Sequence, residues 1–162
     1  MEQVNHPQHY TQHPAGIECI DVVRHYTFDI GCAIKYLWRA GLKKEMGKED
    51  ADKEIEDLRK AIWYINDFRT KEVSVTRTDK LPSICHTFRK VTDCTMQSVV
   101  APYSDDIAVS LRFLFCVGLQ WRGTVWVTSG WQTKLQNAIE SIQKRIQDIE
   151  ESQRSKTMDL EG

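Results

Sequence analysis

The chain has 162 residues, 28% of them charged, and a formal net charge of −1. This length suits one domain, or a small domain with an appendage, and the near balance of acids and bases excludes a global positive field that would attract nucleic acid. No apolar run reaches membrane-spanning length, and the five cysteines include no CxxC pair. We therefore expect a soluble cytoplasmic protein with reduced thiols, no membrane partner and no specific nucleic-acid partner, in which any anion site is local.

The first 16 residues are polar and contain two prolines and three histidines. Prolines at this density predict an irregular loop or an extended arm rather than a helix. Three closely spaced histidines are compatible with a metal site, but outside a helix their spacing does not place them on one face. We expect His9 and Tyr10 to fold over a ligand as hydrogen-bonding groups instead.

A short helix is expected over residues 17–26 and a central helix over residues 30–40. The central helix has one apolar face, since its apolar residues recur at spacings of three and four: Ile30, Ala33, Ile34 and Leu37. The opposite face carries Cys32, Lys35, Tyr36 and Arg39. Gly41 can end this helix because glycine adopts the left-handed conformation without penalty.

The polar face of the central helix is basic. Lys35 and Arg39 are like charges at i,i+4, a mildly destabilising pair, and Lys43 and Lys44 follow the helix. Asp29 is the only acid between residues 27 and 44. These four cations either lie on a solvated face, pair with acids elsewhere in the protein, or hold an anionic ligand.

Residues 48–70 have the clearest helical pattern, with a core-facing stripe formed by Ala51, Ile55, Leu58, Ile62 and Ile65. Asp50, Glu54 and Asp57 flank this stripe, and three neighbouring carboxylates require cations. Those cations are either a divalent metal or the basic face of the central helix. An antiparallel hairpin through residues 41–47 would bring that basic face alongside.

The pattern changes after residue 71, where Ser, Thr, Pro and β-branched residues become frequent. Strict alternation over residues 107–117 favours a strand, with a helix over residues 105–117 as the alternative, and residues 121–127 are expected to pair with that strand. Residues 133–152 predict an amphipathic helix that frays after residue 151 and either docks on the domain or pairs with a second subunit, giving a homo-oligomer.

These patterns predict a mainly α fold in two parts. Residues 1–72 form a helical N-terminal unit with an N-terminal arm. Residues 73–162 form an α+β extension that ends in a long amphipathic helix.

Four sequence blocks, VNHPQHY, GIECIDVV, GCAIKYLWRAGLKK and EDLRKAIWYIND, occur in this order within roughly residues 4–70. Together they resemble the phage domain-of-unknown-function 3310 family, some members of which are called nucleotide kinases after a T7-type phage enzyme. The family usually has asparagine where this chain has Cys32, and a thiol is the weaker hydrogen-bonding group.

The resemblance implies phosphoryl transfer from ATP to a deoxynucleoside monophosphate in the cytoplasm of the host cell. On this basis we assign catalytic roles to Lys35, Arg39 and Asp57. We assign nucleotide binding to His6, His9, Tyr10, Cys32, Tyr36, Lys43, Lys44, Lys60 and Tyr64. Phosphoryl transfer depends mainly on positioning and charge neutralisation, so the cations suit the phosphates, and Glu54 with Asp57 would hold Mg²⁺.

Two alternatives come from other functional classes. The first is a Mg²⁺-dependent all-α nucleoside triphosphate pyrophosphatase, because Glu18-x-x-Asp21 and Glu54-x-x-Asp57 weakly resemble its paired acidic motifs. The second is a non-enzymatic phage protein that sequesters a nucleotide or modulates a host protein.

Overall fold

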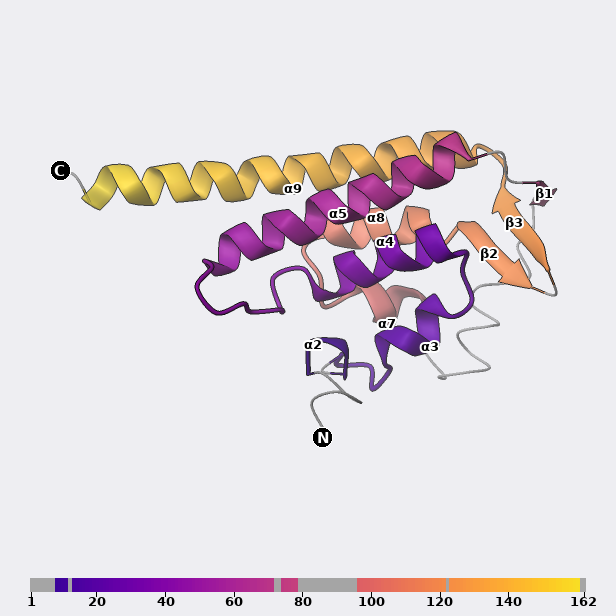
Figure 1. Cartoon of the computed structure of the whole chain (residues 1–162), viewed down its shortest axis with the longest axis horizontal. Coiled ribbons are helices and arrows are strands. Elements are labelled where there is room, and N and C mark those ends of the chain that lie inside the picture. The colour runs from indigo at the N-terminus through magenta and orange to yellow at the C-terminus, as the bar shows by residue number, and fades with distance from the viewer. Residues whose placement is uncertain (1–7, 12, 72–73, 79–95, 122, 161–162) are drawn as a thin grey trace.

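A computed structural model describes residues 8–11, 13–71, 74–78, 96–121 and 123–160 (Figure 1). Its longer helices, which pack side by side, are α4 (Phe28–Arg39), α5 (Asp50–Thr70), α8 (Asp105–Leu114) and α9 (Trp131–Leu160). Short helices lie beneath this layer in Figure 1: α2 (Gln8–Thr11), α3 (Cys19–Val23) and α7 (Met96–Val100). A small sheet lies at one end, so the predicted mainly α fold with an α+β C-terminal part is confirmed.

Helices α4 and α5 form the hairpin that the sequence predicts. Ile30, Ile34 and Leu37 of α4 are fully buried, as are Leu58 and Ile65 of α5. Each stripe lies on one face of its helix because its residues recur at helical spacing. Helices α4 and α5 pack against each other, and both stripes belong to the same core cluster. Gly41 takes a φ of 75° just after α4, as expected for a glycine that ends a helix.

The helix predicted over residues 17–26 is shorter in the structure, where α3 covers Cys19–Val23. Tyr26 leaves the helix and forms a bridge with Leu119, and the Thr27 amide donates to the carbonyl of Gly118 at 2.8 Å. Pairing with a distant strand therefore replaces the last helical turn.

The sheet has the order β1-β3-β2. Strand β1 (Val75–Thr78) is parallel to β3 (Thr124–Thr128), which pairs antiparallel with β2 (Val117–Trp121). The prediction that residues 121–127 pair with a strand over residues 107–117 is therefore wrong in its partner, because β3 pairs with β2, which begins at Val117.

The strand predicted over residues 107–117 is wrong, and the helical alternative is correct for α8. Ala108 and Leu114, placed on the outward face by the alternation, are both buried together with Ile107 and Leu111. Because α8 packs against both α4 and α9, apolar residues surround much of its circumference, and this hides the helical period.

Helix α9 runs past residue 151 to Leu160, so the predicted fraying does not occur in the described chain, and its last turns project beyond α5 (Figure 1). Its apolar stripe is buried against α8 and α5 of the same chain: Leu135, Ile139, Ile142, Ile146 and Ile149. The stripe therefore packs within the chain, which agrees with the prediction that this helix docks on the domain. No helix among the described residues is long and apolar enough to cross a membrane.

The buried residues of the two predicted parts join in one core cluster. Gly118 marks a close approach between them: with φ at 71°, a Cβ built there would lie 2.7 Å from Ile30 Cγ1. The predicted boundary at residue 72 falls outside the described residues.

We predict that Gly118→Ala destabilises the fold by about 2–4 kcal/mol, because it combines a left-handed backbone with a steric overlap. Gly130→Ala is the matched control, since Gly130 has φ of 70° but nothing within 4 Å of its built Cβ. It should cost about 1 kcal/mol. Urea denaturation measures both, and equal losses would contradict the close packing of β2 on α4.

Candidate functional site

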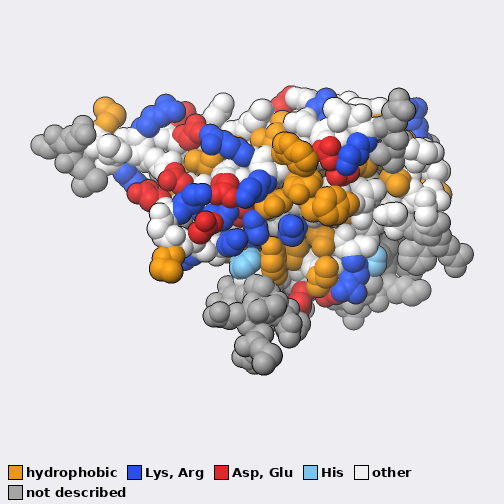
Figure 2. All heavy atoms as spheres, viewed as in Figure 1, with side chains coloured by type: hydrophobic (Ala, Val, Ile, Leu, Met, Phe, Trp, Pro, Cys, Tyr) orange, Lys and Arg blue, Asp and Glu red, His pale blue; other side chains and the backbone are white. Residues whose placement is uncertain are grey.

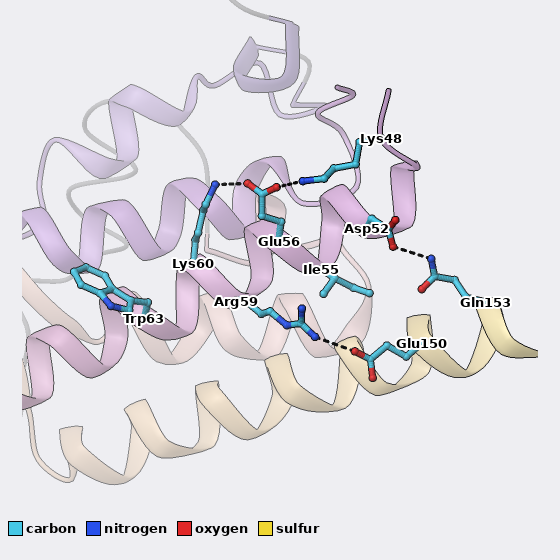
Figure 3. A pocket seen from close by; sticks show the side chains of 9 residues that line it. All are labelled: Lys48, Asp52, Ile55, Glu56, Arg59, Lys60, Trp63, Glu150 and Gln153. Carbon is cyan, nitrogen blue, oxygen red and sulfur yellow. Dashed lines mark hydrogen bonds and ion pairs between the residues drawn. The ribbon is translucent and has the colours of Figure 1, made fainter. Parts of the chain in front are cut away.

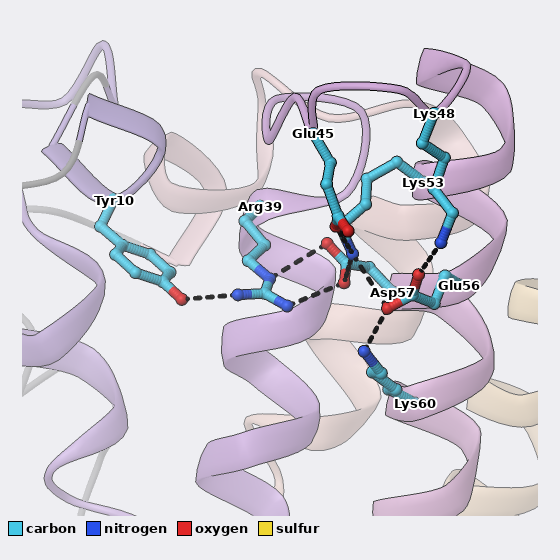
Figure 4. Close-up of polar contacts among 8 residues, drawn as sticks. All are labelled: Tyr10, Arg39, Glu45, Lys48, Lys53, Glu56, Asp57 and Lys60. Atoms are coloured by element: carbon cyan, nitrogen blue, oxygen red, sulfur yellow. Dashed lines mark hydrogen bonds and ion pairs between the residues drawn. The ribbon is translucent and has the colours of Figure 1, made fainter.

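A buried ion pair joins α4 to α5 (Figure 4). Arg39 Nε donates to Asp57 Oδ2 at 3.0 Å, and Arg39 Nη2 donates to Oδ1 at 2.8 Å. Asp57 is 1% exposed and Arg39 is 9% exposed. Lys53, also 1% exposed, donates to Asp57 Oδ1 at 2.8 Å, so one buried carboxylate neutralises part of the charge of two buried cations.

Glu56 lies next to this pair, one helical position before Asp57. It accepts hydrogen bonds from Lys48 and Lys60, and from Lys53 at 3.2 Å. These bonds, Lys48 first, hold the pKa of Glu56 well below its usual range. The carboxylate therefore stays ionised, and much of the basic charge along this part of α5 is internally paired.

The N-terminal arm is held against α4 by Tyr10, whose hydroxyl accepts a hydrogen bond from Arg39 Nη1 at 3.0 Å. The His9 ring lies 4.3 Å from the Tyr10 ring. Burial lowers the pKa of His9, and the charges of Arg39 and Lys43 lower it further. His9 is therefore neutral at pH 7, with a ring nitrogen that can donate or accept. His6 lies outside the described residues.

Three cations surround the Tyr36 ring: Arg39 at 4.6 Å, Lys35 at 4.9 Å and Lys60 at 5.8 Å from its centroid. Tyr64 stacks on the same ring with centroids 5.7 Å apart. Contacts between cations and an aromatic ring are favourable, so Tyr36 helps to hold like charges close together.

Cys32 is buried and contributes to raising the pKa of Tyr64, after burial of Tyr64 itself. It therefore belongs to the inner side of the aromatic pair rather than to the surface. Its predicted nucleotide contact remains a prediction.

Lys35 and Lys43 have no ion-pair partner within the part of the chain that the structure describes. Lys44, by contrast, pairs with exposed Asp50 at 2.8 Å. Figure 2 shows Lys and Arg side chains gathered over α4 and α5, with acidic side chains among them and a hydrophobic patch beside them. We call Lys35, Arg39, Lys43 and His9 the basic cluster. Its charge is net positive because, of its three cations, Arg39 alone pairs with a carboxylate among the described residues.

The two carboxylates expected to hold Mg²⁺ do not share a free face. Both oxygens of Asp57 contact Arg39 or Lys53, and Glu54 pairs with Arg145 of α9 at 2.8 Å. No group of three or more His, Cys, Asp or Glu residues suited to a metal ion occurs among the described residues. This donor set does not fit Mg²⁺ and agrees better with the salt-bridge alternative.

Three of these contacts were not anticipated from the sequence. Lys53 precedes Asp57 by four residues, the spacing of a helical ion pair, so this contact had a local signal. Glu56 lies three residues after Lys53, so its contact with Lys53 also has the spacing of a helical ion pair. Arg145 is 91 residues from Glu54, and no local pattern connects them.

Comparison with known proteins identifies one family. Residues 4–66 match the model of DUF3310, described as a protein of unknown function. This confirms the resemblance to that family predicted from the four sequence blocks. No curated protein and no solved structure matches the chain.

We predict that Asp57→Asn lowers the free energy of unfolding by about 3–5 kcal/mol, since it leaves Arg39 buried without a carboxylate and removes the shortest ion pair of buried Lys53. The loss should be the same with and without Mg²⁺ in urea denaturation. Asp50→Asn, which removes an exposed pair, should leave stability nearly unchanged. A Mg²⁺-dependent gain in wild-type stability that disappears in Asp57→Asn would contradict this account.

We also predict that stability decreases as the pH falls from 7 to 5.5. Burial lowers the pKa of His13 more than its hydrogen bond to the Val99 carbonyl raises it, and burial also lowers the pKa of His9 and His25. Below about pH 6.5 the unfolded chain therefore binds more protons than the folded chain. The slope should be shallower in His13→Gln, and a flat wild-type profile would show that these histidines do not favour their neutral forms.

Proposed function

With residues 4–66 placed in the DUF3310 family, we propose that this protein binds a nucleotide through its phosphates on the basic cluster. The observation that carries the proposal is the pair Lys35 and Lys43, which have no ion-pair partner among the described residues. Both lie close to Arg39: Lys35 shares the Tyr36 ring with it, and Lys43 joins it in lowering the pKa of His9. Phosphate groups are the anions that such lysines and a neutral histidine would bind together.

Arg39 has a positioning role in this proposal. Its charge is compensated by Asp57, and its guanidinium is fixed at 3.0 Å and 2.8 Å by that carboxylate and at 3.0 Å by Tyr10. A cation held this firmly loses little side-chain entropy when a ligand arrives. Lys35 and Lys43 supply the uncompensated charge.

The activity on the bound nucleotide remains a prediction. Transfer of a phosphoryl group from ATP to a deoxynucleoside monophosphate is implied by the family resemblance, and positioned cations suit it. The pairing of Asp57 and Glu54 with cations favours binding that does not use these carboxylates for Mg²⁺. The pyrophosphatase alternative gains no support, since Asp21 pairs with Arg24 and Glu54 pairs with Arg145.

We predict that Lys43→Gln and Lys35→Gln each weaken binding of a deoxynucleoside monophosphate by about tenfold, the loss of one charge-assisted hydrogen bond. Isothermal titration in the absence of Mg²⁺ measures this. Lys144→Gln is the control, because Lys144 is an exposed lysine paired with Asp106 far from the cluster in sequence. Equal affinities in all four proteins would show that the cluster is only a solvated face.

Incubation of the protein with ATP, Mg²⁺ and a deoxynucleoside monophosphate, followed by chromatography of the products, distinguishes the functional classes. Nucleoside diphosphate formation indicates a kinase, and release of pyrophosphate indicates a pyrophosphatase. Binding without turnover indicates a sequestering or modulating protein.

A further inference from the structure

A cleft of about 430 Å³ lies beside the basic cluster. It is enclosed by the N-terminal arm, the end of α4, the start of α8 and single residues of α5 and α9. Such a volume lies within the range of about 300–1,000 Å³ that is usual for small-molecule sites. His9 lines the cleft and also belongs to the basic cluster, so the two features are contiguous.

The walls of the cleft are aromatic and held in place. The His13 ring lies 4.8 Å from the Trp38 ring and 6.0 Å from the Tyr103 ring. His13 Nε2 is 2.8 Å from the Val99 carbonyl oxygen, and the Tyr103 hydroxyl donates to the Trp38 carbonyl at 3.4 Å. Rings fixed by such contacts form a pre-organised apolar surface suited to a planar ligand.

One polar group in this cleft is available to a ligand. Arg145 Nε and Nη2 both contact Oε1 of Glu54, at 2.9 Å and 2.8 Å. The other oxygen, Oε2, has no hydrogen-bond partner among the described residues, and it lies 3.1 Å from the position of a Cβ built on Gly41. Gly41 itself lines the cleft, so this oxygen is an acceptor at its wall.

The Tyr36 ring and the groove between α5 and α9 are less suited to bind a nucleotide base. Tyr36 already contacts Tyr64 and three cations, so its ring is engaged. A groove of about 700 Å³ runs between α5 and α9 (Figure 3). Its six charges balance: Lys48, Arg59 and Lys60 against Asp52, Glu56 and Glu150. In Figure 3 these groups are largely paired with one another, which leaves no net charge for a phosphate.

We infer that the cleft is the pocket for the base of the proposed nucleotide, with Oε2 of Glu54 accepting a hydrogen bond from an N–H on the edge of the base. The inference rests on the proposed function, because the phosphates would occupy the adjoining basic cluster. The ligand class is therefore a nucleotide whose heteroaromatic ring carries an N–H donor.

The first test blocks the cleft. Leu42 lines it and is 51% exposed, so Leu42→Trp should fill its opening without disturbing the core. Isothermal titration should show a loss of about tenfold or more in affinity for a deoxynucleoside monophosphate, with less than about twofold change for pyrophosphate. Met46→Trp is the matched control, since Met46 is fully exposed in the same connection and does not line the cleft.

The second test reverses the polarity of one atom. In Glu54→Gln, Arg145 will retain the carbonyl oxygen as its acceptor, so the amide nitrogen will face the cleft and present a donor in place of an acceptor. Affinity for the nucleotide should fall about tenfold, while pyrophosphate binding and the wild-type fold, checked by circular dichroism, persist.

The outcomes distinguish this inference from the function on which it rests. If pyrophosphate binds and the nucleotide binds no more tightly than deoxyribose 5-phosphate, the base pocket is excluded while the phosphate site stands. If neither pyrophosphate nor the nucleotide binds, both proposals fail. Equal effects of Leu42→Trp and Met46→Trp would also overturn the base pocket.

Discussion

The bidentate ion pair between Arg39 and Asp57 is the contact on which the rest of the site depends. It joins the C-terminal end of α4 to the N-terminal half of α5, and through Tyr10 it also fixes the N-terminal arm. The uncompensated lysines of the basic cluster lie four positions before and after Arg39 in the sequence, and part of the cleft wall, Trp38 and residues 40–42, also adjoins it. A buried pair of this kind adds little net stability over apolar packing, but its geometry is restrictive. We interpret it as a positioning device.

The helical hairpin could be predicted from the sequence because α4 and α5 each have a regular apolar stripe and a polar opposite face. The basic and acidic faces of these helices indicate either ion pairs between them or a divalent metal, and Arg39 and Asp57 form such an ion pair. Helix α8 could not be recognised in this way, because it is apolar on several sides and its sequence therefore lacks a clear helical periodicity. Contacts between Glu54 and Arg145, or between Tyr26 and Leu119, join residues about 90 apart and have no local signature.

Acidic residues next to a basic helix can either neutralise that helix or bind a divalent metal, and the burial of the carboxylate helps to distinguish these two roles. Asp57 is almost fully buried and already contacts two cations, which favours the ion-pair interpretation over the metal-binding one. The C-terminal part of the chain takes part in the candidate site as well, because Tyr103 and Arg145 complete a cleft begun by α4 and the arm. Within the described residues, a protein of nearly zero net charge thus has a local excess of positive charge beside an aromatic cleft.

The most direct test of nucleotide binding at the basic cluster and cleft is an NMR titration of isotopically labelled protein with a deoxynucleoside monophosphate. The account predicts saturable shifts of backbone amides in residues 9–13 and 35–43, with further shifts near Glu54 and Tyr103. Amides lining the α5–α9 groove, such as those of Arg59 and Glu150, should remain unperturbed. Shifts confined to that groove, or no saturable shifts at millimolar nucleotide, would contradict it.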